Sequence, residues 1–442
     1  MAAFETATET KKLYPDMTKL IGSGQYKKVY GATNVKGRNV SLFGIESDMS
    51  PQNVVVAICE TSISRGIIGS RIIDEIVLQN EFSRKTPQLA PYIYGVVVKT
   101  PAGIITTYAG EDLVAGEELS RINHVISTLS RGDVICIYQQ RCDSDLNAHI
   151  KYNLTAIKKH HPDFIASDTT QFIEDIHASI KTLFGNIVEV GYIGVDIKSG
   201  NICHFNGSES AEPVNIGLDM DPAFTYPFEK KMREATPPIE DLEKNILDFS
   251  KHATIFMLIE YYVVFTYMHN EHSGIVSELL TQDEIGCAEI SEMLRFMEEM
   301  EESKYGNIFR YESERFTPIS MLKHYLSFIL KNEIAQNIIN RMRSEGKPVS
   351  KDVTQIMEDA YNEATFKLNR MTLGELATKI CESLGLPLNP NVGVFTSASN
   401  KTDTSIKPAG SRRPRKMNSR KKHLNKRTHK TINARTSKSN PK

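Results

Sequence analysis

Hydrophobic and polar positions divide the chain into a strand-rich first part and a helix-rich second part. Short runs of β-branched and aromatic residues predict strands at residues 54–60, 92–99, 103–109 and 134–138. Apolar residues at helical spacing predict a helix over 66–85, a long amphipathic helix over 170–190 and further helices from 271 to 386. We therefore expect an α+β protein in which a sheet with one helix precedes a helical region.

Charge is distributed unevenly along the 442 residues. Residues 401–442 hold 15 of the 53 Lys and Arg but a single acid, Asp403, so the remaining 400 residues are acidic. A segment this poor in apolar residues cannot offset its ordering entropy, so we expect residues 391–442 to form a disordered basic tail. The tail could bind nucleic acid non-specifically by counterion release, serve as a nuclear address, or act only as a solvated tail.

Cysteines and apolar segments indicate the compartment. The six cysteines show neither close pairing nor metal-ligand spacing, which predicts reduced intracellular thiols. The first residues lack a basic region followed by an apolar core, so we expect no secretory signal. The longest apolar run, 255–268, contains Glu260 and is shorter than the roughly 20 residues of a membrane span. We expect an intracellular protein, in cytoplasm, nucleus or virion, without a membrane span.

Three polar residues interrupt the apolar stretch 192–205. Asp196, Lys198 and Asn201 fall on a predicted loop between extended segments. A carboxylate there can accept a proton from an attacking hydroxyl, an ammonium can neutralise a transferring phosphoryl group, and an amide can ligate Mg²⁺. The alternative is an ordinary polar turn.

A second candidate site lies near the N-terminus, where a strand turns through Gly22 and Gly24. Such glycines let backbone amides approach a phosphate, although a plain hairpin turn is the more frequent explanation of this pattern. Because side chains alternate along a strand, Lys27 shares a face with Val29 while Lys28 points away. On the strand 54–60, Cys59 shares a face with Ala57 by the same rule.

Taken together, these motifs resemble those of eukaryotic-type protein kinases. Asp196, Lys198 and Asn201 match the Asp-x-Lys-x-x-Asn catalytic loop, and the glycine turn with Val29 is similar to the kinase glycine-rich loop, with Lys27 in place of its third glycine. Val-Ala-Ile-Cys-Glu resembles the Val-Ala-Ile-Lys strand, with Cys59 in place of lysine. Lys27 and Cys59 together resemble the With-No-Lysine kinases, and the overall style is that of kinases from large DNA viruses.

The resemblance implies further site residues. A glutamate of the helix 66–85 would pair with the phosphate-binding lysine, and Glu81 is the first choice and Glu75 the second. Backbone groups from Gln139 to Arg141 would bind adenine. Asp143 or Asp145 could contact ribose, although capping of the following helix is the better interpretation.

The segment after the catalytic loop would complete a magnesium site. Asp219 would bind Mg²⁺ with Asn201, as the aspartate of the kinase Asp-Phe-Gly motif does, while Asp221 could add a ligand or cap a turn. Asp248 resembles the aspartate that begins the central helix and holds the catalytic loop, and a simple N-cap explains it as well.

The resemblance implies a two-lobed kinase-like fold with an additional helical C-terminal region. Its expected parts are an extension over 1–15, a sheet lobe over 16–140, a helical lobe over 141–390 and the tail over 391–442. The implied function is transfer of the ATP γ-phosphoryl group, with Mg²⁺, to Ser or Thr of protein substrates, with Asp196 as base. The alternatives are a pseudokinase scaffold and a nucleic-acid-associated structural protein acting through its tail.

Overall fold

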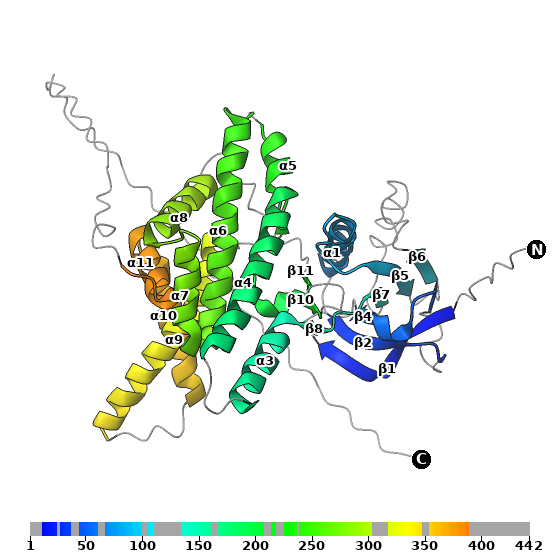
Figure 1. The fold of residues 1–442 in the computed structure, drawn as a ribbon, viewed down its shortest axis with the longest axis horizontal. Helices are drawn as coiled ribbons and strands as arrows, with labels where there is room; N and C mark the ends of the chain where they lie inside the picture. Colours follow the sequence, from blue (N-terminus) through cyan, green and yellow to red (C-terminus); the bar gives the residue numbers. More distant parts are fainter. Residues whose placement is uncertain are drawn as a thin grey trace, which may run out of the picture. The chain divides into compact units, whose positions relative to one another are not determined.

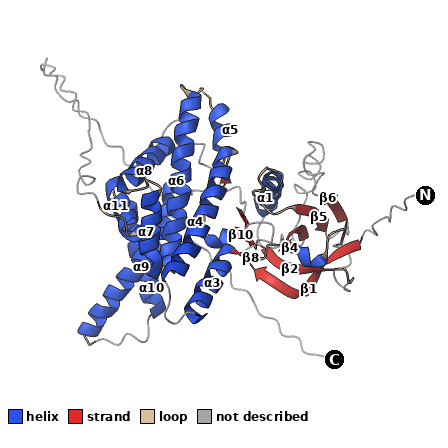
Figure 2. Cartoon of the chain, in the orientation of Figure 1, coloured by secondary structure: helices blue, strands red, loops and turns tan. Residues whose placement is uncertain are grey.

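The fold is described by a computed structural model, in which a sheet with one helix is followed by a helical region (Figures 1 and 2). The described residues are 11–23, 27–36, 44–60, 67–99, 105–109, 134–160, 166–206, 214–217, 225–236, 238–302, 317–346 and 353–388. The chain divides into one compact unit over Met1–Phe395 and a second segment, Thr396–Lys442, which lies wholly outside the described residues.

The first part of the compact unit is an antiparallel sheet. Its described strands are β1 (Lys11–Ser23), β2 (Lys27–Thr33), β3 (Ile45–Ser47), β4 (Val54–Glu60), β5 (Ile93–Lys99), β6 (Ile105–Ala109) and β7 (Val134–Gln140). They lie in the order β3-β1-β2-β4-β7-β5-β6. The single described α-helix of this part, α1 (Ile67–Ser83), connects β4 to β5.

Strand alternation gives the sheet two different faces. On β4, Ala57 and Cys59 join the cluster that includes Ile72 and Ile76 of α1. Val54 and Val56 instead pack with Tyr138 and other residues on the opposite face. Because neighbouring residues of a strand point to opposite faces, β4 is buried on both sides, which explains its continuous apolar run.

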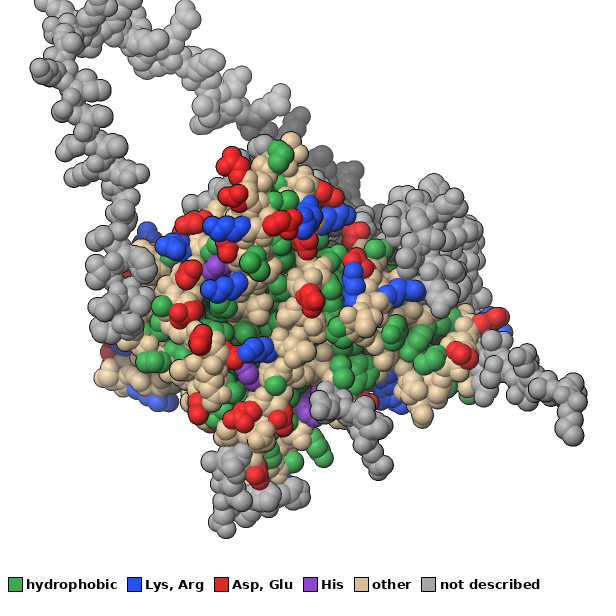
Figure 3. All heavy atoms as spheres, turned by 45° about the horizontal axis from the view of Figure 1, so that its top comes forward, with side chains coloured by type: hydrophobic (Ala, Val, Ile, Leu, Met, Phe, Trp, Pro, Cys, Tyr) green, Lys and Arg blue, Asp and Glu red, His purple; other side chains and the backbone are tan. Residues whose placement is uncertain are grey.

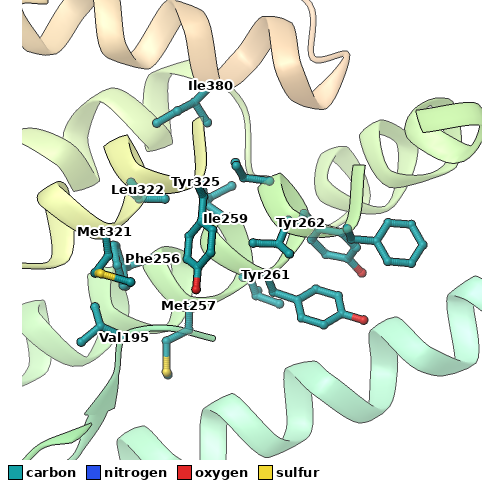
Figure 4. Packing of buried hydrophobic residues seen from close by; sticks show 14 of the residues in the cluster. Val195, Phe256, Met257, Ile259, Tyr261, Tyr262, Met321, Leu322, Tyr325 and Ile380 are labelled. Carbon is teal, nitrogen blue, oxygen red and sulfur yellow. The ribbon is translucent and has the colours of Figure 1, made fainter. Parts of the chain in front are cut away.

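Helices form the second part of the unit around one central helix. Their bounds are α3 (Leu146–His160), α4 (Ala166–Glu189), α5 (Phe228–Arg233), α6 (Leu242–Met268), α7 (Ser273–Gln282), α8 (Cys287–Glu302), α9 (Pro318–Ser344), α10 (Val353–Arg370) and α11 (Leu373–Leu384). Helix α6 is buried continuously from Phe256 to Thr266 and contacts α4, α8, α9 and α11 (Figure 4). A helix that is apolar on every side requires such surroundings.

Short strands join the two parts near the predicted catalytic loop. They are β8 (Ser144–Asp145), β9 (Ile193–Gly194), β10 (Ile202–Phe205), β11 (Val214–Gly217) and β12 (Thr225–Tyr226). Strand β10 pairs with β11 and β8, and β9 pairs with β12. The backbone N–H of Gly217 donates to the carbonyl of Leu89 at 2.9 Å, so β11 is bonded to the segment that follows α1.

Most predicted elements are confirmed, including α1, the long helix α4 and the β10–β11 hairpin. Two boundaries differ. Strand β1 begins at Lys11, inside the segment expected to be an extension, and α6 begins at Leu242, so Asp248 lies within the helix and is not its N-cap. No described helix is long and apolar enough to cross a membrane.

The expectation of unpaired thiols is wrong for four of the six cysteines. The structure joins Cys142 to Cys203 and Cys287 to Cys381, with Cα–Cα distances of 5.6 Å and 5.9 Å, which suit a disulfide. The partners are 61 and 94 residues apart in the sequence, so only the fold reveals their proximity. Cys59 and Cys136 are buried and unpaired with other cysteines.

Candidate functional site

The loop between β9 and β10 carries the predicted catalytic residues. Asp196 adopts the left-handed conformation, with φ of 67°, and a short 3₁₀ turn over Ser199–Asn201 then leads into β10. Aspartate tolerates this conformation better than most residues, although it remains uncommon outside glycine. The unusual backbone conformation therefore lies at the residue predicted to act as base. Strained backbone conformations of this kind often occur at functional sites.

The three predicted loop residues form one hydrogen-bonded cluster. Lys198 Nζ donates to both carboxylate oxygens of Asp196, at 2.9 Å and 3.1 Å. Asn201 Nδ2 donates to the Asp196 backbone carbonyl at 3.0 Å and to Oδ2 at 3.1 Å. The Asp196 side chain is 16% exposed, so the carboxylate is held in one orientation but remains within reach of solvent. An ordinary polar turn does not require these convergent bonds.

A buried glutamate of α6 supports the loop from behind. Glu260 Oε1 accepts a hydrogen bond from the Asp196 backbone N–H at 2.9 Å, and the Ile197 backbone bonds to the same carboxyl group. Glu260 is fully buried, and burial followed by the nearby Asp196 charge raises its pKa well above the usual value. The central helix thus holds the loop backbone through Glu260, the role expected of Asp248.

A tyrosine from the C-terminal region also reaches Asp196. The Tyr325 hydroxyl of α9 donates to Asp196 Oδ1. Its ring lies in the helical core beside Leu322 and Ile259, with the hydroxyl on the side of Met257 and Val195 (Figure 4). Burial, then the Glu260 and Asp196 carboxyl groups, raise the pKa of Tyr325, so its hydroxyl keeps its proton.

Lys27 lies on the face of the sheet that packs against α1. It is directly opposite Cys59 in the β2–β4 register, and its ammonium pairs with the carboxylate of Glu75 on α1. Glu75 is 9% exposed and Lys27 29% exposed at the side chain, so this is a partly buried ion pair. Burial raises the pKa of the Cys59 thiol to about 12, so Cys59 is a small neutral group beside the lysine.

The first choice of lysine partner is therefore wrong. Glu81 is exposed, accepts a hydrogen bond from the Tyr192 hydroxyl at 3.2 Å and pairs with Lys85 at 3.3 Å. Six residues separate it from Glu75, which rotates the two side chains by well over a right angle around an α-helix of about 3.6 residues per turn. The face that α1 turns to the sheet contains Ile72, Glu75 and Ile76. Glu75, the second choice, is therefore the partner of Lys27.

The segment predicted to bind adenine is largely used by the fold. The backbone N–H of Arg141 donates to the Asn53 carbonyl at 2.9 Å, so this one group is already used within the fold. Gln139 is in register with strands on both sides, and its side-chain oxygen accepts from Gln79 at 3.2 Å. The capping interpretation of Asp145 is confirmed, because its Oδ1 accepts from the backbone N–H of Ala148 at 2.8 Å.

Two further predicted residues flank these groups. Val29 is opposite Ala57 in the β2–β4 register, as strand alternation predicts, and both belong to the cluster under α1. Gly22 is paired with Val29 at the end of β1, and a Cβ at Gly22 would meet nothing within 4 Å. Packing within the described chain therefore leaves the space beside Gly22 open. Gly24 lies outside the described residues.

A small cavity opens beside the loop, with a volume of about 30 Å³. It is lined by Asp196, Lys198, Asn201, Gly217 and the α1 residue Phe82, among others. A space of this size accommodates a group of water size, not a nucleotide. The end of α1, the catalytic loop and the strands β10 and β11 all contribute residues to its walls.

A metal site cannot be completed from the described residues. Asn201 commits its Nδ2 to Asp196, and its other amide atom, Oδ1, is the kind of oxygen that Mg²⁺ binds. Asp219 and Asp221 lie outside the described residues, in which no group of three potential ligands occurs. Asn201 is thus chemically compatible with a magnesium site, while its partner ligand stays a prediction.

Sequence reasoning missed Glu260 and Tyr325 as site residues. Glu260 carries a usable signal, because a single acid within the apolar run 255–268 must have a buried polar partner. Tyr325 carries none, since it continues an apolar stripe with Met321 and Ile329 and its ring packs as that stripe predicts. Only its hydroxyl, at the end of the ring, leaves the core.

Comparison with known proteins adds little to this geometry. No protein-family model matches the chain, and no curated protein matches its sequence. Among solved structures, a MAP kinase from Leishmania major is similar, with 12% identity over 87% of this chain and 86% of that chain, and a TM-score of 0.26. Because both the sequence identity and the TM-score are low, the assignment of function has to depend on the residues of the site.

Proposed function

We propose that this chain is a protein kinase that transfers the γ-phosphoryl group of ATP to Ser or Thr hydroxyl groups of protein substrates. The observation that carries the proposal is the hydrogen-bonded cluster of Asp196, Lys198 and Asn201 on a loop fixed by the buried Glu260. A carboxylate, an ammonium and an amide in one rigid constellation match the requirements of phosphoryl transfer. The choice of Ser and Thr follows from Lys198, which resembles the lysine of serine/threonine kinases.

The proposed step uses Asp196 as general base. The substrate hydroxyl oxygen attacks the γ-phosphorus, its proton passes to the Asp196 carboxylate, and the bond between the γ-phosphorus and the β,γ-bridging oxygen breaks to release ADP. Lys198 lies 2.9 Å from Asp196 and so beside the transferring group, where its positive charge would stabilise the charge on the phosphoryl oxygens.

Lys27 is proposed to replace the missing strand lysine. The Lys27–Glu75 pair supports this, because the glutamate of α1 fixes the ammonium on the face of the sheet that also carries Val29 and Ala57. The small neutral Cys59 opposite leaves room for the lysine stem. The open space beside Gly22 would let phosphate oxygens approach the backbone there.

Magnesium is proposed as the cation, held by Asn201 and Asp219, and when bound it would neutralise charge on the phosphates. The residues of this chain do the remaining work. Asp196 accepts the proton, Lys198 and Lys27 provide positive charge, and Glu260 keeps the loop backbone in place.

A pseudokinase scaffold is the second candidate, and two observations favour it. Cys59 stands where an ammonium is expected, and Tyr325 already bonds to Asp196. A nucleic-acid role is the third candidate and would act through the basic tail. On the face of the folded unit drawn in Figure 3, acidic and basic side chains are interspersed.

Incubation of the purified chain with γ-labelled ATP, Mg²⁺ and histone tests the proposal. We expect label on Ser or Thr of the histone or of the chain itself, identified by mass spectrometry. Parallel titration of ATP separates the alternatives. Saturable ATP binding without any transfer indicates a pseudokinase, and the absence of both from folded protein contradicts the proposal entirely.

A further inference from the structure

The Asp196 carboxylate has its hydrogen-bonding capacity filled within the described part of the chain. A carboxylate offers about four acceptor positions, two on each oxygen. Oδ1 accepts from Lys198 and Tyr325, and Oδ2 accepts from Lys198 and Asn201. A substrate hydroxyl that must give its proton to Asp196 needs one of these positions, so one of the donors has to leave.

Three of the four bonds come from the loop itself and are sufficient to orient the carboxylate. Lys198 lies two residues and Asn201 five residues from Asp196. The backbone is fixed independently, since Glu260 accepts from the Asp196 N–H and Asn201 donates to the Asp196 carbonyl. Tyr325 is therefore not needed to point Asp196 in a given direction.

The fourth bond comes from a distant element. Tyr325 lies 129 residues after Asp196, on α9, and the residue is 9% exposed within the helical core. The phenol resembles a substrate in its chemistry, because it presents an O–H group to the carboxylate. It is also the only neutral hydroxyl among these donors, and withdrawing it leaves Asp196 with its Lys198 charge partner.

We propose that the Tyr325 hydroxyl occupies the position on Asp196 that a substrate hydroxyl requires, so that α9 restrains phosphoryl transfer. This inference rests on the proposed kinase function. The acceptor protein competes with Tyr325 for Oδ1 of Asp196, and transfer proceeds when the acceptor hydroxyl displaces the phenol. The restraint acts on the hydroxyl acceptor and leaves nucleotide binding unchanged.

Tyr325→Phe removes the hydroxyl and keeps the ring in the core. We expect kcat/KM for histone to rise about tenfold, the equivalent of one net hydrogen bond to a charged group, while KM for ATP stays the same. Tyr361→Phe is the matched control, because it also removes one phenolic hydroxyl. That hydroxyl, on α10, bonds to His324 Nδ1 of α9 at 3.2 Å and not to Asp196. The control should leave kcat/KM unaltered.

Three results would overturn the inference while leaving the kinase intact. The first is an unchanged kcat/KM in an active Tyr325→Phe variant. The second is a lower kcat/KM in that variant, which would make Tyr325 a positioning residue. The third is phosphate found on Tyr325 itself, which would make Tyr325 a substrate. If the wild type is silent and Tyr325→Phe transfers phosphate, the inference is supported strongly. If every variant is folded and silent, the proposed function fails and this inference with it. If thermal unfolding shows that Tyr325→Phe is destabilised, Tyr325→Met, which also lacks the hydroxyl, is used in its place.

Discussion

At the scale of single residues, two adjacent lysines of β2 have opposite surroundings. Lys27 is opposite Cys59 and pairs with Glu75, whereas Lys28 is opposite Ile58 and exposed. Strand alternation alone separates them, since successive side chains point to opposite faces. The pair therefore offers an internal control for the proposed role of Lys27.

We expect Lys27→Met to lower the rate of phosphate transfer by roughly 10²- to 10³-fold, the usual effect of removing one group that stabilises transition-state charge. Lys28→Met should retain the wild-type rate. Initial rates at several ATP concentrations measure the effect of both substitutions. Thermal unfolding checks that the Lys27→Met variant remains folded, because that substitution removes the ion-pair partner of Glu75. Equal rates for the two variants would remove Lys27 from the mechanism.

At the scale of elements, α6 combines two functions. Its apolar surface forms the centre of the helical region, and its one fully buried acid, Glu260, holds the backbone of the catalytic loop. Burying a carboxyl group here is costly, and the raised pKa of Glu260 shows that burial favours its neutral form. The loop needs an acceptor oxygen at this position, because backbone N–H groups of Asp196 and Ile197 donate to it.

Glu260→Gln keeps that oxygen and should preserve phosphate transfer. Because the folded-state pKa of Glu260 lies above its unfolded value, the wild type is penalised progressively as pH rises above about 4.5, the usual pKa of the group. The variant should therefore gain stability relative to wild type as pH rises above about 4.5, measured by urea unfolding at a series of pH values.

Glu260→Leu is the contrasting variant. It leaves the part-buried backbone N–H groups of Asp196 and Ile197 without their acceptor, which costs about 1–3 kcal/mol each in the free energy of unfolding. We also expect transfer to fall sharply, because the loop loses its support. A Leu variant with wild-type activity would show that the Asp196 loop does not depend on α6.

At the scale of the whole folded unit, the sheet and the helical region meet beside the loop. Phe82 of α1 packs edge-to-face on Tyr192 with ring centroids 4.8 Å apart, and Leu89 bonds to Gly217 of β11. Phe82 also lines the cavity that holds Asp196. Helix α1 therefore carries both Glu75, which pairs with Lys27, and a wall of the loop cavity.

Local patterns predict much of this arrangement and long-range contacts the rest. The shared face of Lys27, Val29, Ala57 and Cys59 follows from alternation, and Asp196, Lys198 and Asn201 are close in the chain. The choice of Glu75 over Glu81 depends on which side of α1 meets the sheet. Tyr325 and the cysteine pairs depend on contacts across 61 or more residues, which no local pattern encodes.

The most direct measurement is single-turnover phosphate transfer by Asp196→Asn, with ATP affinity measured in parallel. Asp359→Asn is the matched control, because Asp359 is an exposed aspartate of α10 that accepts a hydrogen bond from the Gln355 side chain at 2.8 Å and has no role in the proposed step. Loss of a general base should slow transfer about 10²- to 10⁴-fold without changing ATP affinity, while the control stays at the wild-type rate. Transfer by Asp196→Asn at the wild-type rate would contradict the assignment of this loop as the catalytic site.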